Sequence, residues 1–423
     1  MNRSQRPSGP ASAFALAVLL TLTSQAAFAR GHKNTPPITP VNTTSGATAA
    51  ASGATTPAPA ASPAAPPPPA TASPSDFTIH FDTTAVRRLI AMVKVHDENP
   101  ADIDSWLDLP ANKHLVQVGV AQGSLTRDQL KANLIQVLEA RANPQNQPSE
   151  SYGCVRVDPI DAFSHMLDLL EQSADGRAAR IAQHVAQFAP PGVRVNETVY
   201  IHLGGDWDAI NDGGIFINMR FWQGGQTMSW EGIDMIVAHE TMHNVQTAAY
   251  GNPEDQATGP GSWFTALSKI QREGTARYVE YDTDPVPYHP VTYGFIQRAI
   301  DTERGRAFRH DIDLLTPLYA ACFPTFDHSA FRAAYEDGID SGGAYYDIGA
   351  GIAQAIDEKL GRAALIASVA GGPKVFYGDY LALTKTNPDL PKLPDPVATA
   401  VAALPDRIDP GTSTPGVILG GHF

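Results

Sequence analysis

Residues 237–244 read VAHETMHN and place two imidazoles and one carboxylate close together. His239 and His243 are four positions apart, so on an α-helix their rings lie on one face and can converge on one metal ion. Glu240 would project about 100° around that helix, beside the ion rather than onto it. This arrangement predicts a zinc site in which a glutamate acts as general base on water activated by the zinc.

A catalytic zinc needs a third protein ligand. The next helix that we expect, residues 262–281, carries Glu273 after a turn rich in Gly, Pro and Asn. Gly274 and Ala276 beside it are small, which would let the two helices approach each other closely. Glu280 is the competing ligand. We predict one Zn²⁺ per chain, held by His239, His243 and Glu273.

The alternative for the motif is a core helix that carries two hydrogen-bonded histidines. The helix expected over residues 231–250 is apolar on several faces, which indicates that it is buried. Buried imidazoles without partners are costly, and this favours metal binding over the alternative.

H-E-x-x-H followed by E-G-x-A on a later helix resembles the gluzincin clan of zinc metallopeptidases. More narrowly, the chain is similar to a family of predicted secreted zinc-dependent peptidases of unknown function, over most of residues 76–390. The resemblance implies the three ligands named above and Glu240 as the general base. Arg277 departs from the clan pattern, because an Asp that would support a zinc histidine is expected there. Asp282 and Asp284 are the candidates for that supporting role.

The resemblance also implies a tyrosine hydroxyl that stabilises the oxyanion, and Tyr346 fits the Y-x-x-G spacing. Tyr345 and Tyr278 are the next candidates, and a buried aromatic residue is the alternative interpretation of Tyr346. In this clan the strand expected at residues 214–221 would lie at the sheet edge, where an extended peptide can bind by strand addition.

The start of the chain has the features of an export signal. Arg3 and Arg6 precede a short apolar run, and small residues at Ala27 and Ala29 suit a signal peptidase. Residues 1–29 are therefore expected to be a signal peptide, and the mature protein to be periplasmic or secreted from a bacterium. Residues 30–75 contain no Asp or Glu and are rich in Ala and Pro, which predicts a disordered linker.

The net charge of −14 at pH 7 disfavours nucleic acid and anionic lipid as partners. We expect a peptide or protein substrate, and no segment after the signal peptide is long and apolar enough to cross a membrane. The oligomeric state stays open. In an oxidising compartment Cys154 and Cys322 would most simply form a disulfide, with two separate buried thiols as the alternative.

Periodicity predicts an α+β fold. We expect a mainly helical N-terminal lobe at residues 76–190, a catalytic lobe at 191–405 and a tail at 406–423. The catalytic lobe should hold a small β-sheet, then the two metal-ligand helices, then a helical C-terminal part. Strands are expected at 77–81, 193–203 and 214–221, with a turn at 211–214 between the last two. Helices expected in the N-terminal lobe include 159–172 and 176–188.

The function that these features predict is hydrolysis of peptide bonds outside the cytoplasm. One alternative is another zinc hydrolase, such as a strict aminopeptidase, which would need an acidic group to hold the free amine of its substrate. The other is a non-catalytic envelope binding protein with a structural or vestigial zinc site. Glu240 argues against this second alternative, because a closed structural site has no use for a base beside the metal.

Overall fold

The computed structural model describes residues 71–95, 99–121, 125–142, 151–152, 155–156, 160–204, 209–219, 230–252, 258–281, 308–340 and 343–407. The expected signal peptide lies outside these ranges, as do most of the expected linker and tail. By their contacts, the described residues belong to one compact unit. The boundary between lobes expected near residue 190 falls inside this unit and stays a prediction.

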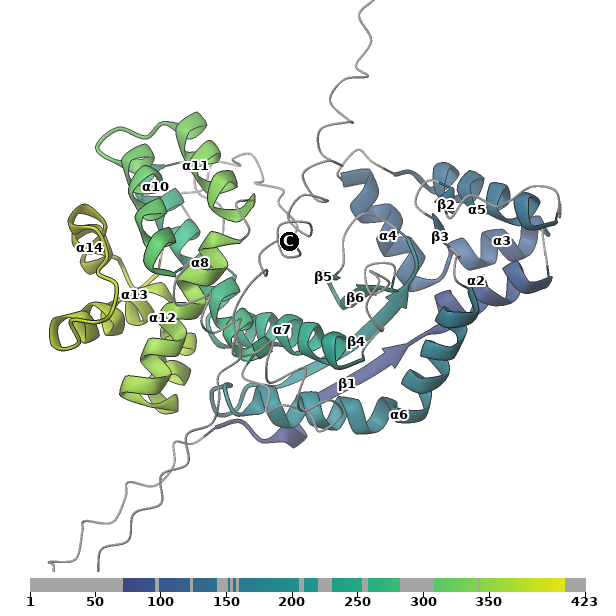
Figure 1. Cartoon of the computed structure of the whole chain (residues 1–423), viewed down its shortest axis with the longest axis horizontal. Helices are drawn as coiled ribbons and strands as arrows, with labels where there is room; N and C mark the ends of the chain where they lie inside the picture. Colours follow the sequence, from purple (N-terminus) through teal and green to yellow (C-terminus); the bar gives the residue numbers. More distant parts are fainter. Residues whose placement is uncertain are drawn as a thin grey trace, which may run out of the picture. The chain divides into compact units, whose positions relative to one another are not determined.

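The N-terminal part of the described chain consists mainly of helices (Figure 1). These are α2 (Thr84–Val95), α3 (Pro100–Leu107), α4 (Pro110–Ala121), α5 (Arg127–Ala142) and α6 (Ile160–Ala186), together with the 3-10 helix η1 (Pro74–Asp76). The short strands β2 (Ser151–Tyr152) and β3 (Val155–Arg156) pair with each other. The segments expected as helices at 159–172 and 176–188 are helical over most of their length, but the break expected between them was wrong, because α6 runs unbroken through Gly176. A glycine inside a helix costs only about 1 kcal/mol, which the burial of apolar residues on both sides of it offsets.

A four-stranded mixed sheet supports the site (Figure 1). Its order is β1 (Phe77–Asp82), β4 (Val195–His202), β6 (Ile215–Asn218) and β5 (Ala209–Asn211). β4 is parallel to both β1 and β6, whereas β5 is antiparallel to β6. β1 therefore joins residues of the expected N-terminal lobe to the sheet of the catalytic lobe.

The strand expected at 214–221 is present as β6, but the edge position expected for it was wrong, because β6 lies between β4 and β5. β5 is the outer strand on this side. The turn at 211–214 is present, but it joins β5 to β6 in a hairpin. It cannot join β4 to β6, since those two strands are parallel, and parallel neighbours need a longer connection.

Helices follow the sheet, as expected. They are α7 (Trp230–Ala249), α8 (Gly259–Tyr281), α10 (Leu315–Cys322), α11 (His328–Asp340), α12 (Ala344–Leu360), α13 (Arg362–Thr386) and α14 (Asp395–Ala402), with the 3-10 helix η3 (Ile312–Leu314) before α10. α7 packs against α6, β4, β5 and β6, and α8 packs against α7, α10, α12 and α13. The structure is mostly helical with one small mixed sheet, which confirms the α+β class.

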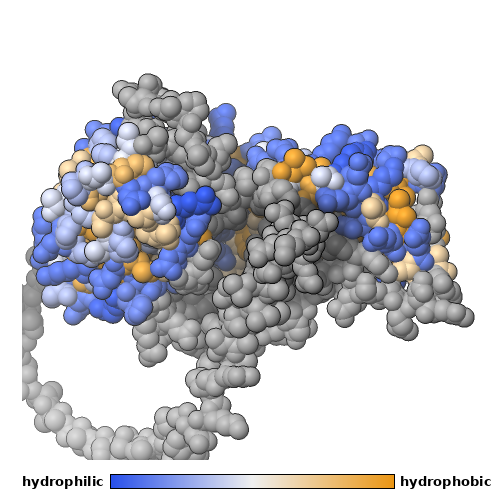
Figure 2. Space-filling view, turned by 90° about the horizontal axis from the view of Figure 1, so that it is seen from above, coloured by the Kyte–Doolittle hydropathy of each residue, from blue (hydrophilic) through white to orange (hydrophobic). Residues whose placement is uncertain are grey.

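The described surface is predominantly hydrophilic on the face in Figure 2, and its hydrophobic residues occur in small groups. Large apolar side chains that are exposed are Val95, Val120, Leu169 and Leu360. Within the described residues, no helix combines the length and the apolar character needed to cross a membrane.

No disulfide is found among the described residues, so the bridge expected between Cys154 and Cys322 has no support. Cys322 is a free thiol with 1 % of its surface exposed, at the end of α10. Cys154 lies outside the described residues. Burial raises the pKa of the Cys322 thiol to about 12, which keeps it protonated and unreactive at neutral pH.

Candidate metal centre

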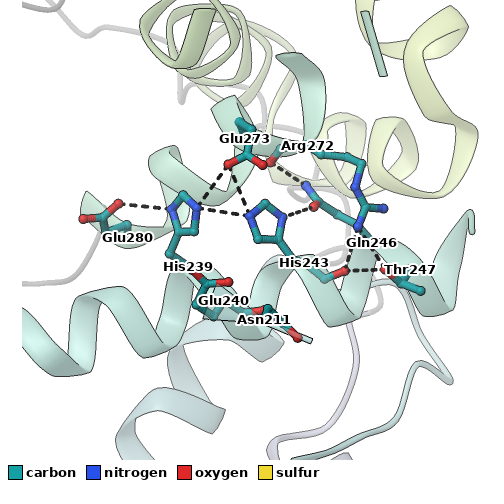
Figure 3. Close-up of polar contacts among 9 residues, drawn as sticks. All are labelled: Asn211, His239, Glu240, His243, Gln246, Thr247, Arg272, Glu273 and Glu280. Atoms are coloured by element: carbon teal, nitrogen blue, oxygen red, sulfur yellow. Dashed lines mark hydrogen bonds and ion pairs between the residues drawn. The ribbon is translucent and has the colours of Figure 1, made fainter. Parts of the chain in front are cut away.

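The site is built on α7, whose buried residues anchor it to the core. Val237, Met242 and Val245 are fully buried, so the helix cannot rotate without exposing them. This orientation directs His239 and His243 together toward α8, where Glu273 meets them (Figure 3). The structure thus brings the three expected ligands into one cluster.

The distances within this cluster are those of a metal site. The Nε2 atoms of His239 and His243 are 3.1 Å apart, and Glu273 Oε2 lies 3.4 Å from the first and 3.3 Å from the second. A tetrahedral zinc with bonds of about 2.1 Å would separate neighbouring ligand atoms by about 3.4 Å. The three atoms therefore already form one face of a tetrahedron of the right size.

The other ring nitrogens show which protons the imidazoles carry. His239 Nδ1 lies 3.2 Å from Glu280 Oε2, and His243 Nδ1 lies 3.1 Å from Gln246 Oε1. Gln246 is held in this orientation because its Nε2 donates to the Arg272 carbonyl at 3.0 Å. A carboxylate and an amide oxygen only accept, so both Nδ1 atoms donate. In the neutral form of each ring, which is the form that binds a metal ion, the Nε2 lone pair therefore faces the common point.

The electrostatics of the cluster also call for a cation. Burial alone would lower the pKa of His239, but its hydrogen bonds to Glu273 and Glu280 and the charge of Glu240 raise it well above the usual value. Burial alone would raise the pKa of Glu273, but the neighbouring imidazoles of His243 and His239 hold it well below its usual value. Glu273 Oε2 is buried, and its contacts of 3.3 and 3.4 Å to the two imidazoles are ion-pair contacts that lack hydrogen-bond geometry. Two neutral imidazoles and a carboxylate form a donor set that zinc prefers, so the residues fit the ion.

Glu280 was the competing ligand in our sequence interpretation. The structure places it behind His239, on the nitrogen that faces away from the cluster, and gives the ligand position to Glu273. Glu280 thus takes the place of the supporting carboxylate that is missing at Arg277. The expected candidates Asp282 and Asp284 lie outside the described residues.

Glu240 lies next to the cluster without belonging to it (Figure 3). Its side chain is 7 % exposed and lines a cleft of about 600 Å³ that also contains the three cluster residues. Its backbone carbonyl accepts a hydrogen bond of 2.8 Å from the side-chain amide of Asn211, the last residue of β5. This bond ties the outer strand of the sheet to the helix that carries the motif, and β5 forms one wall of the cleft.

Tyr346 reaches the same cleft from α12. Burial and the charges of Glu273 and Glu240 raise the pKa of its hydroxyl, so it stays protonated at neutral pH. The other two tyrosine candidates have core contacts instead. Tyr345 donates to the carbonyl of Ala334 at 3.0 Å, and Tyr278 donates to a carboxylate oxygen of Asp357 at 2.8 Å.

Gly274 allows α12 to pack closely against α8. A Cβ at this position would lie 2.1 Å from the Cα of Gly349 on α12, and one at Gly349 would lie 2.2 Å from the Ile270 carbonyl oxygen. The two glycines therefore allow backbone contact between α8 and α12. We had expected the small size of Gly274 to allow close packing between α7 and α8. This expectation was wrong, because the helix that Gly274 contacts is α12.

A buried carboxyl group lies beneath the motif. Glu197 on β4 is 7 % exposed, accepts a hydrogen bond from the hydroxyl of Thr241, and accepts another of 2.5 Å from Asn244 Nδ2. Burial is the main reason that its pKa is raised to about 7, with the charge of Glu240 acting in the same direction. These contacts attach α7 to the sheet on both sides of Met242.

Sequence reasoning did not identify Gln246, Arg272 or Glu197 as part of the site. Gln246 is three residues after His243, a helical spacing that could have indicated a partner for that ring. Arg272 and Glu197 gave no comparable signal, because they meet α7 only through the tertiary fold.

The comparisons with known proteins agree with this geometry. No curated protein and no solved structure matches the chain. A family model described as "Putative zinc dependent peptidase (DUF5700)" matches residues 103–389, which is more than half of the chain and includes α7, α8 and α12. The chain therefore belongs to the family that carries this description.

Proposed function

We propose that the protein is a zinc metallopeptidase that hydrolyses peptide bonds with His239, His243 and Glu273 as the ligands of one Zn²⁺. The observation that carries the proposal is the triangle of 3.1, 3.3 and 3.4 Å between their ligand atoms, set in an open cleft. When bound, Zn²⁺ acts as a Lewis acid that polarises a peptide carbonyl and lowers the pKa of water.

Glu240 is the general base of this proposal. Its carboxylate accepts a proton from the attacking water molecule and passes it to the amine that leaves when the C–N bond breaks. Support comes from its place in the cleft beside the cluster and from Asn211, which fixes its backbone. Glu280 and Gln246 keep the two imidazoles in the orientation and tautomer that ligation requires.

Tyr346 is proposed to donate a hydrogen bond to the oxygen that becomes negatively charged in the transition state. The Arg277 guanidinium lies 5.6 Å from the centre of the Tyr346 ring and pairs with Asp347 at 3.5 Å. These contacts restrict the motion of the ring within the cleft wall.

An extended peptide is proposed to bind along β5, which has the outer position that we had assigned to residues 214–221. Backbone pairing with a three-residue strand offers only a few hydrogen bonds. Side-chain contacts elsewhere in the cleft must then supply most of the preference between substrates.

Export is a separate part of the proposal. We infer that the mature protein begins after Ala29 and acts in the periplasm or outside the cell. Sequencing of the N-terminus of protein purified from the native host should find Arg30 first, and a chain that still begins at Met1 would contradict export by this signal.

The activity test compares wild type with Glu240→Gln. Purified wild type should contain about one zinc per chain and cleave members of a peptide library, whereas Glu240→Gln should keep the zinc and lose cleavage. Glu336→Gln is the matched control, because Glu336 is an exposed carboxylate on α11 that pairs with Arg332.

The two alternatives give different results in this test. Native protein without zinc would refute the ligand assignment. Protein that contains zinc but cleaves no peptide would refute the peptidase, and would favour the binding protein with a structural zinc. Cleavage only at free N-termini would identify a strict aminopeptidase.

A further inference from the structure

One end of the cleft carries a guanidinium group that the proposed reaction does not use. Arg272 precedes the proposed ligand Glu273 on α8 and lines the cleft together with Thr247 and Asn252. Figure 3 shows it at the His243 end of the cluster, whereas Glu280 lies beyond His239 at the opposite end. The two ends of the site therefore carry opposite charges.

The hydrogen bonds of Arg272 fix the guanidinium without neutralising it. Nη1 donates to the Gly251 carbonyl at 3.2 Å, and Nη2 donates to the His243 carbonyl at 3.3 Å and to Thr247 Oγ1 at 2.9 Å. A guanidinium has five N–H groups. Within the described residues, Nε–H and the second Nη1–H have no acceptor, and no carboxylate lies within 4.0 Å.

Carbonyl groups at the end of α7 interact favourably with a nearby cation, so part of the role of Arg272 is to support that helix. Such carbonyls carry only partial charges, and a full positive charge facing a cleft still favours an anion. Arg277 on the same helix differs in this respect, because its guanidinium pairs with Asp347 at 3.5 Å.

Asn252 adds further donors beside Arg272. Its Oδ1 lies 2.9 Å from Thr247 Oγ1, which holds the oxygen side of the amide toward α7. The Nδ2 group has no acceptor among the described residues, and the residue is exposed at the cleft. A fixed guanidinium with an adjacent amide is a typical arrangement for binding a carboxylate, which accepts several hydrogen bonds at once.

We propose that Arg272 and Asn252 form a carboxylate subsite, and that the enzyme prefers peptides with a carboxylate on the side of the cluster where His243 lies. This inference rests on the proposed peptidase function. The carboxylate can be the C-terminus of the peptide or the side chain of an Asp or Glu residue.

The test measures binding to full-length mature protein that contains zinc and carries Glu240→Gln, so that no peptide is consumed. Three labelled peptides of one sequence are compared by fluorescence anisotropy. The first is uncharged and amidated, the second has a free C-terminus, and the third is amidated with one Asn replaced by Asp. N-acetylglycinate and N-acetylglycinamide are compared by calorimetry as probes that need no peptide recognition.

Either carboxylate peptide is expected to bind tighter than the uncharged peptide by on the order of tenfold. The second peptide reports a C-terminal carboxylate, and the third reports an acidic side chain. Arg272→Gln should abolish the preference, whereas Arg309→Gln, an equal change of charge at an exposed position, should keep it.

Asn252→Asp tests the subsite without removing the support that Arg272 gives to α7. The new carboxylate would lie beside the guanidinium and neutralise it, so the preference should also disappear. Equal binding of all three peptides, or a preference that survives both Arg272→Gln and Asn252→Asp, would overturn the subsite.

The proposed function and the subsite fail in different ways. If no peptide binds but N-acetylglycinate binds better than its amide, and Arg272→Gln removes this difference, the subsite stands and the peptidase proposal fails. If neither the peptides nor N-acetylglycinate bind in a manner that depends on Arg272, the subsite is refuted.

Discussion

Gly274→Ala is expected to destabilise the protein by a net amount of about 2 kcal/mol. The new Cβ would lie 2.1 Å from Gly349 Cα and 2.5 Å from the backbone nitrogen of Ala350. These are backbone atoms, so α12 itself must retreat by more than about 1 Å. Overpacking costs about 1–3 kcal/mol, and contact with backbone indicates the upper end of that range. The higher helix propensity of alanine returns at most about 1 kcal/mol.

Gly378→Ala is the matched control. Gly378 lies inside α13, is exposed, and would have nothing within 4 Å of a new Cβ. The same substitution should therefore stabilise the protein, by about 0.5–1 kcal/mol. Urea denaturation of the two variants should give free energies of unfolding that differ by about 3 kcal/mol. Equal stability of the two variants would refute the backbone contact between α8 and α12.

The same substitution should separate metal binding from catalysis. The proposed ligands lie on α7 and α8, whereas Tyr346 lies on α12 and moves with it. Gly274→Ala should thus keep about one zinc per chain while kcat falls by up to about 100-fold, as expected for a displacement of about 1 Å. Retention of full kcat in this variant would show that Tyr346 does not contribute from α12.

Three further substitutions test separate contacts. Glu280→Gln should weaken zinc affinity by about 10–100-fold, measured by competition with a chelator, because His239 loses its anionic partner. Tyr346→Phe should lower kcat by about 100-fold with little change in KM, measured by steady-state kinetics. Glu197 has a pKa raised from 4.5 to about 7 in the folded protein, so the native state holds this proton more tightly than the unfolded state does. The contribution of Glu197 to the free energy of unfolding is complete below about pH 4.5 and falls by about 3 kcal/mol as the pH rises to about 7. Glu197→Gln should remove this decline, measured by urea titrations at a series of pH values.

Each of these substitutions has its own control. Glu358→Gln on α12 changes an exposed carboxylate and should leave zinc affinity unchanged. Tyr345→Phe removes a hydroxyl that donates to core carbonyls, so it should lower stability and not kcat. If the stability of wild type varied with pH as that of Glu197→Gln does, the pKa of Glu197 would be the same in the folded and unfolded states, and the raised value would be refuted.

The features that the sequence could predict are local ones. His239 and His243 share a face in any α-helix because they are four residues apart. The strand at residues 77–81 follows from the alternation of its side chains. Both predictions therefore depend only on neighbouring residues. Glu273 needed one assumption about how the next helix returns, and Gly274, which we had taken as support for that assumption, contacts α12 instead. The cluster distances are consistent with the assumption itself.

The features that the sequence could not predict depend on contacts between distant segments. Glu280 supports His239 because α8 packs against α7, a contact that no spacing along the chain reveals. The three-residue strand β5 is too short for a periodic signal, so the outer position was assigned to the longer run that follows it. A larger residue at position 274 would clash with the backbone of Gly349 on α12. The sequence does not show that these two residues become neighbours in the fold.

The parallel pairing of β1 with β4 has a consequence for the order in which the protein can assemble during synthesis. Phe77 cannot pair before Val195 has been synthesised. The first strand is therefore without its neighbour while the ribosome adds the residues between them. The cluster is complete only after Glu273 has appeared, and Tyr346 comes later still. A chain interrupted before α12 would contain the complete HExxH motif and all three proposed ligands, yet would lack the helix that carries Tyr346. Pairing between segments so far apart along the chain also favours slow folding.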